Sequence, residues 1–98
     1  MRYDREFVQS LNQFLPAVVA DIIRRQPASP ERTAFAWSVA VGPALARVTT
    51  VELRDRTLIA TARDTRWAKE VDRAKGTILA RVQHLLGDGI DRIDVLTE

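Results

Sequence analysis

The sequence predicts an α+β domain in which helices pack on one face of a three-stranded sheet, with the element order α-α-β-β-α-β. Apolar side chains recur every three or four residues over 7–23 and again over 65–86, and they alternate every second residue over 49–62. A short apolar segment over 90–96 predicts a third strand. A strand that follows a crossover helix normally runs parallel to its predecessor, so the sheet is expected to be mixed.

The first helical segment carries an apolar stripe from Phe7 to Ile22. Pro16 lies inside this stripe, where proline removes a backbone donor and clashes with the preceding turn. We therefore expect either a kink or two helices that meet at Leu15 and Pro16.

The second helix is predicted over 30–41 from the residues at its two ends. Ser29 is a suitable N-cap, and Pro30 is favoured as the first helical residue. Gly42 can adopt the left-handed conformation that ends a helix. Pro43 either blocks continuation or opens one further short turn through Arg47.

A β-hairpin is predicted after this helix, with a tight turn at Asp55 and Arg56. The turn lacks glycine, so its type stays open. A long helix then follows over 65–86, with Gly76 inside it and Gly87 at its end.

Composition and charge limit the kind of protein. The chain has 98 residues, of which 46% are hydrophobic and 29% are charged, which suits a single globular domain over 1–98. It has no cysteine, which excludes disulfides, cysteine-based zinc sites and thiol catalysis. The N-terminus lacks the apolar core of a signal peptide, and no apolar run is long enough to span a membrane. A cytoplasmic protein with no membrane contact is expected.

Basic residues are concentrated in the middle of the chain, where 47–86 carries nine of them against five acidic ones. If the hairpin tip adjoins the start of the long helix, these residues form one positive surface that suits nucleic-acid phosphates. The alternative is an ordinary solvated face whose arginines pair with nearby carboxylates. The candidate nucleic-acid-binding residues are Arg54, Arg56, Arg63, Arg66, Lys69 and Arg73.

The two tryptophans have different expected roles. Trp37 lies one turn before Gly42 and is predicted to anchor the second helix in the core, so both are candidate structural residues. Trp67 lies in the first turn of the long helix, where it is either a core residue or a partner-binding residue. His84 is the single histidine, so neither a metal site nor a catalytic triad is indicated. No cofactor is expected.

The chain resembles the DciA family of bacterial helicase loaders. The segments WSVAVGPALARVT and VELRDRTLIATARDTRWAKEV carry the resemblance, with a family core over 15–96 and an N-terminal helical extension over 1–14. The matching positions are Trp37, Val41, Gly42, Leu45, Ala46, Thr49, Leu53, Asp55, Leu58, Thr65, Trp67 and Ala68.

The resemblance implies a KH-like fold and a non-enzymatic adaptor that binds the replicative DNA helicase and DNA, with single-stranded DNA as the expected form. Val51 and Arg56 differ from the family pattern, and a short member without a basic tail after Glu98 is expected. No G-x-x-G loop occurs, which argues against the RNA binding of ordinary KH domains. The alternative function is a standalone nucleic-acid binder of low sequence specificity. An enzyme is the weakest hypothesis, because no carboxylate pair stands out from the general charge pattern.

Overall fold

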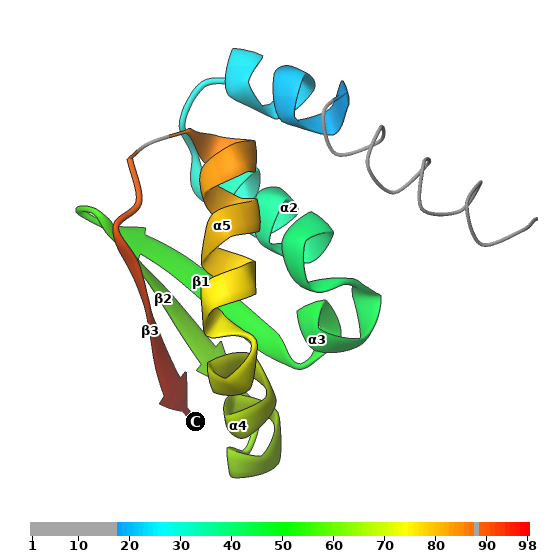
Figure 1. Cartoon of the computed structure of the whole chain (residues 1–98), viewed down its shortest axis with the longest axis vertical. Helices are drawn as coiled ribbons and strands as arrows, with labels where there is room; N and C mark the ends of the chain where they lie inside the picture. The colour runs from blue at the N-terminus through cyan, green and yellow to red at the C-terminus, as the bar shows by residue number, and fades with distance from the viewer. Residues whose placement is uncertain (1–17, 88) are drawn as a thin grey trace, which may run out of the picture.

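The computed structural model describes residues 18–87 and 89–98, in the predicted order of helices and strands (Figure 1). The predicted kink at Pro16 and the predicted extension over 1–14 lie outside these residues. Residues 18–25 are helical. The elements that follow are α2 (Pro30–Val41), α3 (Pro43–Arg47), β1 (Thr49–Arg54), β2 (Thr57–Ala62), α4 (Thr65–Arg73), α5 (Lys75–Leu86) and β3 (Arg92–Thr97).

The ends of α2 are those that its sequence predicts. The Ser29 hydroxyl accepts a hydrogen bond of 3.0 Å from the Arg32 amide, which satisfies one of the free donors at the helix start. Gly42 has a φ of 86°, a value that few residues other than glycine adopt. Pro43 does open a further turn, α3, which leads the chain into β1.

The three strands form a mixed sheet in the order β1-β2-β3. β1 and β2 are antiparallel, with Thr49 opposite Ala62, and β2 and β3 are parallel, with Leu58 opposite Ile93. The hairpin turn dispenses with glycine because Asp55 adopts a φ of 56°, and aspartate is among the residues that tolerate this region.

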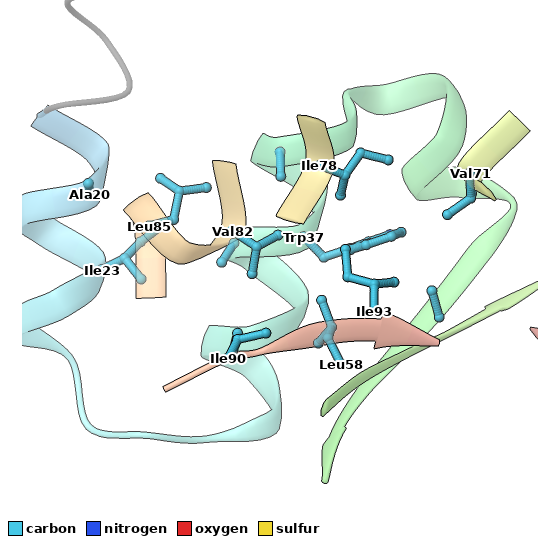
Figure 2. Packing of buried hydrophobic residues seen from close by; sticks show 13 residues of the cluster. Ala20, Ile23, Trp37, Leu58, Val71, Ile78, Val82, Leu85, Ile90 and Ile93 are labelled. Atoms are coloured by element: carbon cyan, nitrogen blue, oxygen red, sulfur yellow. The ribbon is translucent and has the colours of Figure 1, made fainter. Parts of the chain in front are cut away.

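All the labelled helices lie on one face of the sheet and enclose the core (Figure 1). Along β2, burial alternates residue by residue, as expected for a sheet with one covered face. Trp37 lies at the centre, between Ile78 and Val82 of α5 and the side chains of the sheet (Figure 2). The buried residues of β2 are Leu58, Ala60 and Ala62.

The predicted long helix is divided at Ala74, which has φ −96° and ψ 8°. A straight helix over 65–86 would be about 33 Å long, whereas a six-residue strand spans only about 20 Å. The break lets α4 pack against the ends of β2 and β3 while α5 packs against α2. Gly76 is not the break itself, since it lies in the first turn of α5.

Candidate nucleic-acid interface

The basic residues predicted to bind nucleic acid lie at two opposite ends of the sheet. Strand β2 runs from the hairpin tip to the start of α4, so the tip and the helix are separated by about 20 Å. Figure 1 shows the tip beside the start of β3 and α4 at the other end of the strands. The single positive surface that required the two to adjoin is therefore not formed.

The arginines at the hairpin tip are neutralised by neighbouring carboxylates. Arg54 pairs with Glu52 at 3.0 Å. Arg56 donates two hydrogen bonds to Asp91, from Nε at 2.7 Å and from Nη2 at 2.9 Å. These hydrogen bonds, together with the positive charge of Arg56, lower the pKa of the Asp91 carboxyl. The tip therefore offers little uncompensated charge to a phosphate.

The other end of the sheet gathers basic residues that have no carboxylate partner among residues 18–87 and 89–98. Arg47 is the last residue of α3, and Arg63 links β2 to α4. The Arg63 amide donates to the Val48 carbonyl at 2.9 Å, which places these two stretches side by side. Together with Arg66 and Lys69 on α4 they form what we name the α3–α4 cluster. All four side chains are exposed, and none is in an ion pair with any residue that the structure describes.

The first turn of α4 is fixed by its own cap. The Asp64 carboxylate accepts a hydrogen bond of 3.0 Å from the Trp67 amide, as an N-cap aspartate does. The Trp67 ring is half-buried, and the Arg66 guanidinium lies over it at 5.1 Å from the ring centroid. This contact orders Arg66 while its charge stays at the surface.

Three of the predicted cations lie on α4, namely Arg66, Lys69 and Arg73. Arg73 is not free, because it pairs with Glu70 at 3.6 Å. Arg66 and Lys69 are thus the available cations of these three.

Arg47 is the residue that the sequence reasoning missed as a site candidate. The hairpin register pairs Thr49 with Ala62, so the residues just before β1 and just after β2 are neighbours. That signal was present in the sequence once the two strands were paired about the turn at 55–56.

Two consecutive hydrogen bonds on the buried side of α3 fix the backbone near Arg47. Trp37 is only 2% exposed and lies in the core, as predicted. Its Nε1 donates to the Thr49 hydroxyl at 2.8 Å, and this hydroxyl donates to the Leu45 carbonyl at 2.6 Å. These two hydrogen bonds fix α3 against α2 and β1, and they therefore fix the backbone that carries Arg47.

The described residues contain no cluster of histidine and carboxylate side chains that could hold a metal ion. His84 is exposed near the end of α5, where its backbone carbonyl accepts a hydrogen bond from Arg24. Within the same residues, no helix combines the length and the apolar character needed to cross a bilayer.

A family model described as "Dna[CI] antecedent, DciA" matches residues 6–95. The chain belongs to the DciA family. This family is one of non-enzymatic adaptors associated with loading of the replicative helicase in bacteria. The match reaches into the segment 1–14 that was expected to be an extension. A search of curated proteins found no match to the chain.

Proposed function

We propose that this protein is a non-enzymatic adaptor that binds the replicative DNA helicase and single-stranded DNA and promotes helicase loading in the bacterial cytoplasm. Membership of the DciA family over residues 6–95 supports this role. The observation that carries the DNA part of the proposal is the α3–α4 cluster, because its four exposed cations lack carboxylate partners within the described chain.

The cluster suits the DNA backbone better than the bases. Arginine guanidinium groups bind phosphates through paired hydrogen bonds, and each phosphate contact releases counterions. The Trp67 ring, which was expected to be either a core residue or a partner-binding residue, is half-buried, and the Arg66 guanidinium lies over it. We therefore assign Trp67 to positioning Arg66 at the DNA surface. Binding of low sequence specificity follows from this arrangement.

The test is a pull-down of the tagged protein with the replicative helicase from the same bacterium. It is run with and without single-stranded DNA at two salt concentrations. Helicase retained without DNA supports the adaptor role. The proposal fails if the helicase is lost under every condition.

A standalone nucleic-acid binder is the second candidate, because one chain supplies all four cations of the α3–α4 cluster and needs no partner protein to form it. This function predicts DNA retention that falls steeply with salt and that is unchanged by the helicase. This candidate is favoured if the tagged protein retains DNA but does not retain the helicase that is present in the same mixture.

A further inference from the structure

The outer edge of β3 is not covered by another element of the described residues. The strand order β1-β2-β3 puts β1 and β3 at the two edges of the sheet, and each pairs with β2 alone among residues 18–87 and 89–98. α2 and α3 contact β1, and Figure 1 shows them on the side of β1 that faces away from β3. No described helix lies along the outer edge of β3 (Figure 1). β3 is therefore the more accessible edge for a further strand.

The backbone of β3 alternates between residues that bond to β2 and residues that point outward. The Glu98 amide donates to the Ala62 carbonyl at 3.0 Å, so the even-numbered residues of this strand direct their backbone groups toward β2. The N–H and C=O groups of Ile93, Val95 and Thr97 then point away from the sheet. Such a row of outward groups is a template for pairing with another chain.

Charge favours a second copy of this chain as the strand that pairs with β3. Two copies of β3 related by a two-fold axis run antiparallel, and the residue on the axis sets the register. With Val95 on the axis, the whole run 92–98 overlaps in both copies, and Arg92 lies opposite Glu98 of the second copy. Opposite charges across an antiparallel pair are stabilising. Both side chains are exposed, and Glu98 is in no ion pair with a described residue.

The two neighbouring registers are less favourable. With Asp94 on the axis, two like carboxylates lie opposite each other, which is destabilising. With Ile93 on the axis, the new ladder needs the Asp91 amide to point outward, but this amide already donates to the Arg56 carbonyl of its own sheet at 2.7 Å. The register about Val95 has neither fault. It also sets Leu96, which is 52% exposed, diagonally beside Leu96 of the second copy.

We propose that this protein self-associates through β3, as a two-fold dimer in which the two β3 strands pair antiparallel about Val95. The sheet is then continuous across the two copies. The contact is confined to one strand of each copy, so the interface is small and the dimer is weak. The inference rests on the strand edge and its charges, and it does not depend on the proposed function.

The test is sedimentation equilibrium of the full chain over a concentration series that reaches the millimolar range. Glu98→Arg places like charges opposite each other at both ends of the interface, so we expect the dissociation constant of the dimer to rise at least tenfold. The charge-swapped variant Arg92→Glu/Glu98→Arg restores opposite charges and should dimerise within about threefold of the parent. Arg54→Glu is the matched control, because it reverses an exposed charge on the other edge strand, and it should dimerise as the parent does.

Thr97→Pro tests the backbone of the same edge. Thr97 is exposed and its amide points outward, so proline removes a donor of the new ladder and none of the bonds to β2. We expect the dimer to be lost, with an unchanged melting temperature at a dilution where the parent is monomeric.

Three results would overturn the inference. The first is a parent that stays monomeric throughout the series. The second is a Glu98→Arg variant that dimerises as the parent does, or as weakly as Arg54→Glu, since either result places the contact elsewhere. The third is a charge-swapped variant that stays as weak as Glu98→Arg, because the register about Val95 is then wrong.

Discussion

Thr49 joins three elements through one side-chain hydroxyl. It accepts a hydrogen bond from Trp37 of α2 and donates one to the Leu45 carbonyl of α3, while its own backbone begins β1. The hydroxyl is buried, and the indole N–H that it satisfies is buried as well. A tryptophan, a helix stop and a threonine at this spacing therefore act together, and the Gly42-Pro43 turn brings them into contact.

We predict that Thr49→Val destabilises the fold by about 1–3 kcal/mol, because the Trp37 N–H loses its acceptor in the core. The free energy of unfolding is measured by urea denaturation. Thr50→Val is the matched control, since Thr50 is the neighbouring residue and is exposed. Equal stabilities for the two variants would contradict the role given to Thr49. The double variant Trp37→Phe/Thr49→Val should lose less free energy of unfolding than the two single variants lose together, because the donor and its acceptor are then both removed.

Asp91 joins the hairpin tip to the start of β3, and the same contacts make it sensitive to pH. The hydrogen bonds from Arg56 hold the Asp91 pKa below its ordinary 3.8. A carboxyl whose pKa is lower in the folded state stabilises the fold above the unfolded pKa, and this contribution is lost as the pH falls through the folded pKa. The pair therefore contributes in full at neutral pH and weakens only in acid below that ordinary value.

In Arg56→Gln we expect the pKa of the Asp91 carboxyl to rise, because the positive partner is gone. An NMR titration of the side-chain carboxyl in the parent and the variant measures this change. A pKa that stays low in Arg56→Gln would show that another group holds it down.

At the scale of the elements, the α3–α4 cluster depends on three connections that meet at one end of the sheet. α3 delivers Arg47, the end of β2 delivers Arg63, and α4 delivers Arg66 and Lys69. Ion pairs remove charge at the hairpin end, so the two ends of the sheet differ although both are rich in arginine.

The double variant Arg66→Ala/Lys69→Ala should therefore bind single-stranded DNA more weakly, with an unchanged melting temperature. Loss of two phosphate contacts should reduce the slope of log K against log salt by about 1.4. A fluorescence-anisotropy titration over a series of salt concentrations measures both effects.

The matched control for this experiment is Arg54→Ala/Arg92→Ala, which makes the same change in net charge at the hairpin end. Both of these arginines are exposed and each is already paired with a carboxylate. An equal loss of affinity in the control would mean that DNA responds to net charge and not to the α3–α4 cluster.

The element order and the sheet could be predicted from the sequence because they follow from local signals. The capping residues predicted the ends of α2, and the change of periodicity at Thr65 predicted the start of the helix that follows the hairpin. The crossover rule predicted a mixed sheet. The break at Ala74 could not be predicted in this way. The apolar stripe continues through it from Val71 to Ile78, and periodicity reports which face is buried, not whether the helix axis is continuous.

The candidate site was harder to predict, because it depends on distances across the sheet. Residue types marked six cations but could not show which of them had carboxylate partners. Arg56 and Asp91 are far apart in the chain, and their pairing requires the parallel contact of β2 with β3. That the six cations bind nucleic acid and that the fold is KH-like both remain predictions.

At the scale of the whole molecule, the labelled helices cover one face of the sheet, and no helix of the described residues covers the other (Figure 1). The α3–α4 cluster belongs to the helical layer and the sheet end, not to the open face. The open face carries short-range ion pairs such as Arg54 with Glu52 and Arg92 with Asp94, which suit a solvated surface.

α5 sets the distance between the two ends of the helical layer. It is 12 residues long, its last turn is hydrogen-bonded to Arg24 of segment 18–25, and its first residue directly follows α4, which carries Arg66 and Lys69. A helix of this length spans about 18 Å along its axis. The α3–α4 cluster is therefore held at a fixed distance from segment 18–25, and a substitution in that segment should leave the cluster unchanged.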